Sequence, residues 1–352
     1  MNEIDETQVN EFAAKFLGDL GAAMHSATVV IGDRLGLYEK LAEIGPATAA
    51  QLGDSAGCDE RYVLEWLNAQ AASGYCEYAD GRYWLTPVQA FCLANPESPA
   101  YLTGGALVVT SVHKDVERSI NAIRTGRGVA WGDHDKHLFA GTERFFRPGY
   151  RANLAANWIP SLDGVEAKLR RDGTVADVGC GHGASSIVLA QAFPTARIIG
   201  FDSHPGSIDA ARKSAVEAGV GERVTFEVAN AQDFPGNGYD LVCILDALHD
   251  MGDPVAAAAH IRSTLAADGT WLLVEPAAGE TVAENLASGL SRVFYSASTL
   301  VCTQSARSQP GGYALGAQAS TEQLRAVCER GGFTRFRLAT STPVNRVFEV
   351  RP

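Results

Sequence analysis

The sequence has no long apolar run, no paired-cysteine spacing and no excess of basic residues. No stretch of about 18 consecutive apolar residues occurs, which argues against a membrane-spanning helix. The seven cysteines are scattered and never spaced as C-x-x-C, so neither a zinc ribbon nor a disulfide framework is indicated. The acidic amino-terminal segment also lacks the basic start and apolar stretch of a secretory signal. These absences predict a cytoplasmic protein with reduced thiols.

Basic residues are fewer than acidic residues in this sequence. The chain has 29 basic and 41 acidic residues and a formal net charge of −12, a balance that repels nucleic-acid phosphates and anionic membrane surfaces. Its 46% apolar and 20% charged residues are typical of a globular protein. A length of 352 residues exceeds one average domain. We therefore expect several folded parts and a small-molecule partner, with nucleic acid and membrane disfavoured.

Residues 1–100 combine helical periodicity with one short hairpin. Between Thr7 and Leu41 the apolar spacing predicts two helices that each bury one face, and the first of these carries Phe12, Phe16, Leu20 and Met24. A helix, a turn and a second helix from Asp59 follow, and then a hairpin that turns at Asp80–Gly81. This order is typical of a winged-helix domain.

A winged helix can bind DNA through its second helix, but that helix is poor in cations here. It reads "DERYVLEWLNAQAAS" and contains Arg61 as its only basic residue. The segment favours a scaffold for dimerisation. Residues 101–170 form a predicted helical connector or lid, interrupted by the aromatic-rich segment 128–150, in which His134 and His137 read as solvated loop residues.

From Thr174 onward, short β-branched runs alternate with helices. This alternation predicts crossover units and a parallel sheet covered on both faces, so that residues 171–352 form a Rossmann-like, doubly wound α/β domain. The last two runs, "FTRFRLAT" and "NRVFEVRP", are too close together for a crossover helix and predict an antiparallel hairpin at the sheet edge.

The first strand of this domain ends in "VADVGCGHGASS", a glycine-rich turn before a helix. Gly179, Gly181 and Gly183 allow positive φ and close approach of a ligand to bare backbone at a helix N-terminus. The same spacing fits a dinucleotide site, and Asp202 serves a ribose hydroxyl in either case.

Two acidic positions favour S-adenosylmethionine over a dinucleotide. Asp177, two residues before the first glycine, opposes a pyrophosphate and suits the methionine end of the cofactor. The third strand ends in "VANAQDF", which offers Asp233 to an adenine amino group with Phe234 beside the ring.

With these motifs in order, residues 170–352 resemble class I S-adenosylmethionine-dependent methyltransferases. Together with the winged-helix-like part, the whole chain resembles actinobacterial and plant small-molecule O-methyltransferases, in which that part supports dimerisation. The resemblance implies that Asp177 and the glycines hold the methionine end, Asp202 the ribose, and Asp233 with Phe234 the adenine. The remaining predicted cofactor contacts are Ser203, Ala231, Leu245, Asp246 and Tyr150.

The fourth strand leads into "LHDMGDP". In the plant-like enzymes a His-Asp pair stands here and the histidine deprotonates the acceptor hydroxyl, which makes His249 the candidate general base. Met251 replaces the usual tryptophan. A structural histidine is one alternative, and a metal held by Asp246, His249 and Asp250 is another; no matching Asp-Asn pair occurs later in the chain, so we expect no metal.

The resemblance implies an acceptor that is a small, apolar or aromatic hydroxylated molecule. Its candidate contacts are Trp131, Phe146 and Tyr295. A second hypothesis is a winged-helix transcriptional regulator that binds S-adenosylmethionine as an effector.

Overall fold

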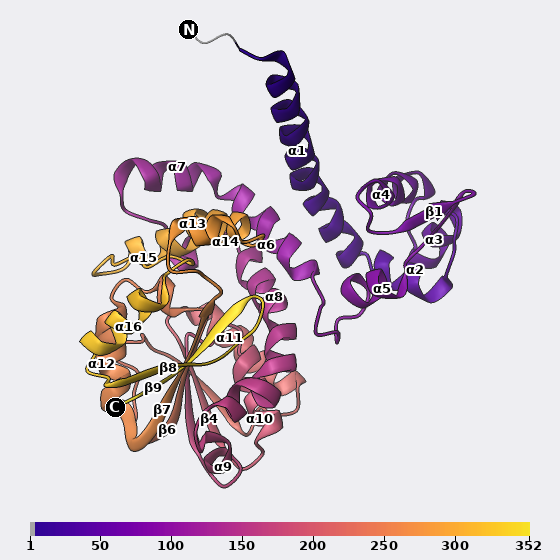
Figure 1. The fold of residues 1–352 in the computed structure, drawn as a ribbon. Coiled ribbons are helices and arrows are strands. Elements are labelled where there is room, and N and C mark those ends of the chain that lie inside the picture. Colours follow the sequence, from indigo (N-terminus) through magenta and orange to yellow (C-terminus); the bar gives the residue numbers. More distant parts are fainter. Residues whose placement is uncertain (1–3) are drawn as a thin grey trace. The chain divides into compact units, whose positions relative to one another are not determined.

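The computed structural model describes residues 4–352, which form two compact units (Figure 1). The first unit comprises the chain up to His113 together with Ala140–Pro148. The second comprises Lys114–Phe139 and Gly149–Pro352. The segment Ala140–Pro148 lies within helix α8 (His137–Asn153), so the chain returns once to the first unit before it forms the sheet of the second.

Helices and one small hairpin build the first unit. The order is α1 (Glu6–Arg34), α2 (Leu37–Ile44), α3 (Ala49–Ala56), α4 (Glu60–Ala72), β1 (Glu77–Ala79), β2 (Arg82–Trp84), α5 (Pro87–Leu93) and α6 (Thr103–Lys114). Thr48 and Asp59 cap α3 and α4 through their side chains. The predicted hairpin is confirmed, because β1 and β2 pair antiparallel and Asp80 and Gly81 both adopt positive φ.

A half-buried ion pair joins distant parts of this unit. Nη1 and Nη2 of the Arg144 guanidinium both donate to the Asp33 carboxylate. The hydroxyls of Tyr101 and Thr103 donate to the same carboxylate, at 2.6 and 2.8 Å. Burial raises the pKa of Asp33, but these donors and the charge of Arg144 lower it by more, so that the pKa lies below its ordinary value. The ionised carboxylate therefore stabilises the first unit.

The amino-terminal helix differs from the expectation. The structure has two helices between Thr7 and Leu41, as predicted, but α1 does not bury its apolar face. The side chains along this face are exposed: Val9, Phe12, Phe16, Leu17, Leu20 and Met24. The helical period is correct, but no other element among residues 4–352 covers the stripe.

A seven-stranded sheet organises the second unit (Figure 1). Its strands are β3 (Thr174–Val178), β4 (Arg197–Asp202), β5 (Val224–Val228), β6 (Tyr239–Leu245), β7 (Leu265–Pro276), β8 (Arg335–Ser341) and β9 (Asn345–Arg351). The spatial order is β5-β4-β3-β6-β7-β9-β8. The first five strands are parallel, while β9 pairs antiparallel with both β7 and β8. The Rossmann-like fold and its antiparallel edge hairpin are thus confirmed.

Helices cover both faces of the sheet. In Figure 1, α10 (Ala184–Ala192) and α11 (Pro205–Glu217) lie on one side, and α12 (Pro254–Thr264) and α16 (Thr321–Arg330) on the other. Large buried side chains fill the core on the second side, among them Phe201, Phe234, Trp271, Phe333 and Phe348. Burial of this apolar area is the main stabilising contribution.

Short helical segments complete the second unit. They are α7 (Val116–Thr125), η1 (Trp131–Asp133), the π-helix η2 (Leu154–Trp158), η3 (Ile159–Ser161), α9 (Val165–Leu169), η4 (Leu248–Asp250), α13 (Val282–Leu286), α14 (Ser291–Ala297), the π-helix η5 (Ser298–Cys302) and α15 (Thr303–Ser308). The sequence predicted an interruption across 128–150, whereas α8 continues through Pro148. Proline usually ends a helix, but the turns on both sides sustain this one.

Candidate functional site

The glycine turn between β3 and α10 has the backbone that the motif predicted. Gly179, Gly181 and Gly183 have φ of 76°, 54° and 81°. A Cβ on Gly183 would lie 2.8 Å from the ring of Phe226, so this glycine is required for packing as well as for its φ. A Cβ on Gly181 would meet nothing within 4 Å. The turn therefore packs against the domain at Gly183 and leaves bare backbone beside open space at Gly181.

Two aspartates hold this turn. Oδ2 of Asp202, at the end of β4, accepts from the backbone N–H of Gly181 at 3.0 Å, and Oδ1 accepts from the N–H of His204 at 2.8 Å. Oδ2 of Asp177 accepts from the hydroxyls of Ser185 and Ser186, both at 2.6 Å. Burial raises the pKa of both carboxyls. The structure thus brings the β3 and β4 parts of the predicted cofactor site together.

Asp246 stands at the end of β6, directly after the buried Leu245. Its φ of 53° is unusual for a residue other than glycine. Oδ1 accepts from the side-chain amide of Asn345 at 2.8 Å, and the Tyr150 hydroxyl hydrogen-bonds the carboxylate. Burial, and then the charge of Glu275, raise the pKa of Asp246 well above its ordinary value. Its Oδ2 is buried without a hydrogen-bond partner among residues 4–352, which suits a ligand that donates or carries positive charge.

The predicted adenine contacts, Asp233 and Phe234, and the further cofactor contacts Ser203 and Ala231 differ in burial. Ser203 and Asp233 are exposed and Ala231 is half-buried. One oxygen of Asp233 accepts from the N–H of Asn230 at 3.1 Å. The ring of Phe234 is buried in the core, 5.1 Å from the ring of Phe201.

His249 lies in the single turn η4, four residues after β6. Its Nδ1 is 2.5 Å from Oε2 of Glu275 at the end of β7, and the other oxygen of Glu275 accepts from the N–H of Leu248 at 3.0 Å. Nε2 of His249 is 3.2 Å from Oδ1 of Asp250. Burial lowers the pKa of His249, but Glu275 and then Asp250 raise it by more, so that it lies well above its ordinary value.

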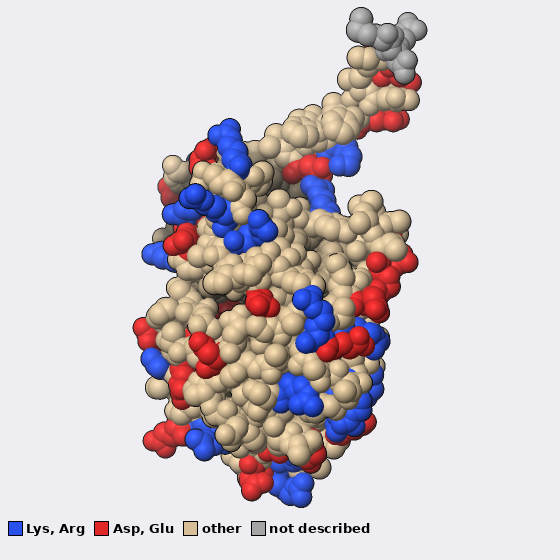
Figure 2. Space-filling model, turned by 90° about the vertical axis from the view of Figure 1, so that its left-hand side faces the viewer, with Lys and Arg blue, Asp and Glu red and all other residues tan. Residues whose placement is uncertain are grey.

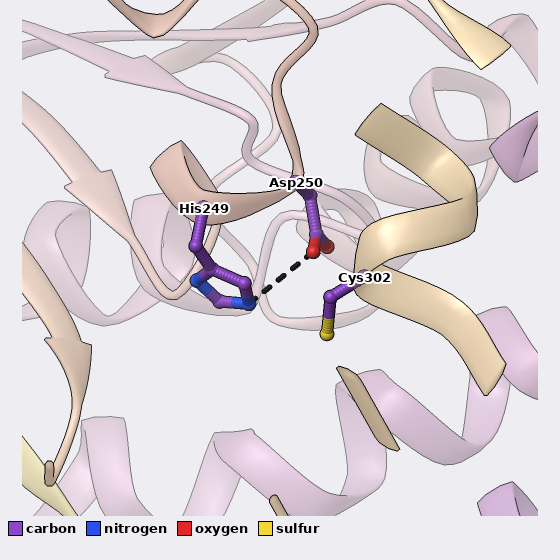
Figure 3. Close-up of side chains that lie close together, drawn as sticks. All are labelled: His249, Asp250 and Cys302. Carbon is purple, nitrogen blue, oxygen red and sulfur yellow. Dashed lines mark ion pairs between the residues drawn. The ribbon is translucent and has the colours of Figure 1, made fainter. Parts of the chain in front are cut away.

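A thiol completes this cluster (Figure 3). Figure 3 shows the side chains of His249 and Asp250 from one short segment converging with Cys302 from a neighbouring helix. Cys302 ends the π-helix η5 and is buried. Burial and then the charge of Asp250 raise the pKa of its thiol to about 11.

The three predicted acceptor contacts each have their own neighbours within their unit. Trp131 packs against Phe139 at 5.3 Å, and Phe139 packs against His204 at 4.8 Å, which places Trp131 beside the loop that follows Asp202. The hydroxyl of Tyr295 accepts from Asn285 at 3.3 Å within the second unit. Phe146 packs against Phe145 in the first unit.

Three residues at the site were missed from the sequence. Glu275 ends a predicted strand in "TWLLVEP", so the argument that singled out Asp246 also applied to it. Asn345 and Cys302 carried no such signal, because one begins the antiparallel strand β9 and the other sits in a helix far along the chain.

The chain matches two family models. Residues 169–329 match the model described as a methyltransferase domain, and residues 23–95 match an Rv2258c-like winged HTH domain. Both parts of the predicted resemblance are therefore confirmed. Residues 169–329 thus belong to a methyltransferase domain.

Individual relatives agree with these matches. A ubiquinone biosynthesis O-methyltransferase of Pseudomonas paraeruginosa is 33% identical over 124 residues, which are 34% of this chain and 50% of that protein. The mitomycin 7-O-methyltransferase MmcR has the same fold, with a TM-score of 0.68 at 20% identity and coverage of 98% of this chain and 100% of the other. Human N-acetylserotonin methyltransferase in complex with SAM gives 0.65 at 18% identity, with 100% and 99% covered. The chain spans between 23% and 50% of the lengths of the curated relatives that it matches.

The regulator hypothesis is not favoured. On α4, Arg61 forms an ion pair with Glu65, and in the hairpin Arg82 donates to the carbonyl of Pro46 and to Gln51. These two cations are therefore engaged within the first unit and are poorly placed to neutralise phosphates. Figure 2 shows Lys and Arg interspersed with Asp and Glu on the face that it displays, without a continuous basic surface. Among the described helices, none has the length and hydropathy needed to cross a membrane.

Proposed function

Because the chain carries a methyltransferase domain behind a winged HTH domain, we propose that it transfers the methyl group of S-adenosylmethionine to a hydroxyl of a small, apolar or aromatic acceptor. One observation carries the proposal. The carboxyl ends of neighbouring parallel strands present a glycine turn after β3, held by Asp202 of β4, and beside it the pair formed by His249 after β6 and Glu275 of β7. Ligands of open α/β sheets bind at such carboxyl ends.

The residues of the glycine turn fit the cofactor. Gly181 offers backbone beside open space, and Asp202 lies at the turn with both oxygens already oriented by N–H groups. Asp177 and Asp246 add a buried and a half-buried carboxyl group, and Oδ2 of Asp246, which has no hydrogen-bond partner among residues 4–352, suits a group that donates or carries positive charge. S-adenosylmethionine supplies a methyl group activated by a positively charged sulfonium. An acidic site favours that ligand over an anionic pyrophosphate.

His249 is the proposed general base. The hydrogen bond from Nδ1 to Glu275 fixes the ring. In the neutral form of the imidazole it leaves Nε2 as the nitrogen that accepts a proton from the acceptor hydroxyl. The carboxylates of Glu275 and Asp250 then stabilise the imidazolium that forms. Glu275 is thereby a positioning residue, and its own orientation is fixed by the N–H of Leu248.

The aromatic residues of the second unit support an apolar acceptor. Trp131, Tyr150 and Tyr295 are the proposed contacts in this unit, and Phe146 of the first unit stays a candidate. The carboxylates around the proposed base narrow the class of acceptor further. Asp246, Asp250 and Glu275 surround the proposed base, so a neutral or cationic acceptor is favoured over an anionic one.

A homodimer is the proposed assembly. The exposed apolar face of α1 carries Phe12, Phe16, Leu20 and Met24, which are 70%, 59%, 47% and 70% exposed. Contiguous apolar surface of this kind marks an interaction site, and a helix with one apolar stripe packs well against its own copy. The proposed location is the cytoplasm, which the seven free cysteines support.

Transfer of a labelled methyl group tests the function. Purified protein, S-adenosylmethionine and a panel of phenolic and aliphatic alcohols are incubated, and product is detected by label and by mass. Methylation of at least one alcohol by the wild type, with His249→Ala strongly reduced, supports the proposal. Methylation that His249→Ala leaves unchanged contradicts the role of the base, and DNA binding that weakens with salt while no acceptor reacts contradicts the enzyme.

A further inference from the structure

Three ligand atoms of different kinds converge beside the proposed base. Nε2 of His249, a carboxylate oxygen of Asp250 and Sγ of Cys302 all lie within 4.8 Å of one another (Figure 3). His249 and Cys302 are buried, and Asp250 is half-buried. Imidazole, carboxylate and thiolate are the donors that Zn²⁺ takes in proteins, at about 2.0–2.3 Å from the ion. The spacing therefore needs only small side-chain movements to close around one ion.

The outer partners have the arrangement of a metal-bound histidine. A histidine that ligates a metal through one nitrogen usually donates its other N–H to a carboxylate, which fixes the tautomer and makes the ligand more basic. Glu275 takes this position at Nδ1 of His249, 2.5 Å away, and is itself held by the N–H of Leu248. Nε2 faces Oδ1 of Asp250 at 3.2 Å, so a cation between the two atoms, either a proton on Nε2 or a metal ion, satisfies both of them.

A second histidine gives independent support. The side chain of His134 is fully buried, and its Nδ1 lies 3.1 Å from Oδ2 of Asp115. Its Nε2 has no hydrogen-bond partner within residues 4–352. His134 also lies close enough to Asp250 to act on its carboxylate electrostatically. The neighbourhood of Asp250 thus holds a further unsatisfied nitrogen donor, and such buried nitrogens call for an explanation.

From this geometry we infer that His249, Asp250 and Cys302 form a binding site for a soft divalent metal ion, of which Zn²⁺ is the representative. The thiol of Cys302 and Nε2 of His249 lose their protons to solvent as the ion binds, and the thiolate and Nε2 each contribute an electron pair. A three-ligand site of this kind keeps one coordination position open. The inference replaces the expectation of no metal, and it uses a ligand set other than Asp246, His249 and Asp250.

Occupancy by the ion and general-base catalysis exclude each other. Both need the lone pair of Nε2 of His249, so the ion inhibits methyl transfer of the proposed kind. This inhibition rests on the proposed function, whereas binding of the ion does not. A binding measurement without cofactor and acceptor therefore stays informative even when no acceptor is found.

The test is titration of the metal-free full chain with Zn²⁺ and, for its spectrum, with Co²⁺. The variants are Cys302→Ser, Cys302→Ala, Glu275→Gln and the matched control Cys58→Ser, whose thiol donates to a backbone carbonyl in the first unit. Circular dichroism and thermal unfolding establish that each variant is folded. The cobalt spectrum reports a thiolate ligand directly, through its thiolate-to-metal charge-transfer band.

We expect one Zn²⁺ per chain and a cobalt–thiolate band in wild type and Cys58→Ser. Loss of a partner that only orients a ligand weakens metal binding roughly 10–100-fold, which we expect for Glu275→Gln; both Cys302 variants lose the band and at least about 100-fold in affinity. Wild-type affinity within about twofold of a folded Cys302 variant, or a cobalt spectrum without the band, overturns the inference. Where an acceptor is known, Zn²⁺ should inhibit wild type and spare Cys302→Ser, and equal inhibition of the two overturns the competition.

Discussion

Nδ1 of His249 lies 2.5 Å from Oε2 of Glu275, so the residue at the end of β7 fixes the ring of a residue that follows β6. The two strands are parallel neighbours, and their carboxyl ends bring the two side chains together. A parallel register thereby positions residues that are 26 apart in the sequence.

Glu275→Gln separates positioning from proton transfer. His249→Ala should lower kcat by about 10²–10⁴-fold, since that is the usual contribution of a general base. Glu275→Gln keeps a hydrogen-bond acceptor for Nδ1 and should lower kcat less, with S-adenosylmethionine affinity unchanged in both variants. Steady-state kinetics with cofactor titration measure this. A larger loss of kcat in Glu275→Gln than in His249→Ala contradicts the assignment.

Gly183→Ala tests the packing of the glycine turn. At a φ of 81° the backbone of any residue with a Cβ is strained, and here the added Cβ would also lie 2.8 Å from the ring of Phe226. Gly219 is the matched control, because its φ of 70° imposes similar strain and its Cβ meets nothing within 4 Å. Overpacking costs about 1–3 kcal/mol, so Gly183→Ala should lower the free energy of unfolding by that much more than Gly219→Ala. Urea unfolding measures the difference, and equal losses would refute the packing role.

Acid unfolding tests the pair formed by Asp33 and Arg144. The pKa of Asp33 is lower in the folded than in the unfolded protein, so the unfolded chain binds the proton first as pH falls. Its contribution to stability is therefore complete above the unfolded value of about 3.9 and is lost as pH falls through the folded pKa. Asp33→Asn should be less stable than wild type at pH 7 and should lose less stability below pH of about 4. The exposed Asp54→Asn should follow the wild type in urea titrations at each pH.

The exposed apolar face of α1 leads to a prediction about the oligomeric state. Phe12→Asp with Phe16→Asp places charge on the exposed apolar stripe and should convert a dimer to monomers at the same protein concentration, without loss of α/β structure. Tyr62→Asp is the control, because Tyr62 is 81% exposed on α4, outside this stripe. Sedimentation equilibrium gives the mass. A wild-type monomer, or a dimer in the double variant, contradicts the proposed interface.

The periodic spacing of apolar residues and the residue types at turns made most of the fold predictable from the sequence. The strands of the sheet, the hairpin at Asp80–Gly81 and the antiparallel edge follow from local patterns in the sequence. Helix α8 was missed, because Pro148 marks a boundary in sequence, whereas the helix continues through it. The exposure of α1 was also missed, since apolar periodicity shows that a face exists and not what covers it.

The site was predictable where strands end and not elsewhere. Asp202, Asp246 and His249 follow predicted strands, and the topology brings strand ends together. Cys302 joins them from a π-helix about 50 residues later, and only the folded chain places it there. Phe234 also follows a predicted strand and was predicted to lie beside the adenine ring, but its ring is buried against Phe201 in the core.

Calorimetric titration with S-adenosylmethionine, S-adenosylhomocysteine and NAD tests the central claim most directly. Wild type and the exposed-site control Asp209→Asn should bind both adenosyl ligands and not NAD. Asp202→Asn should bind them about 10–100-fold more weakly, because a hydrogen bond to a charged group contributes about 1.5–3 kcal/mol. Binding of NAD alone by the folded wild type, or an Asp202→Asn affinity equal to that of wild type, would contradict the account.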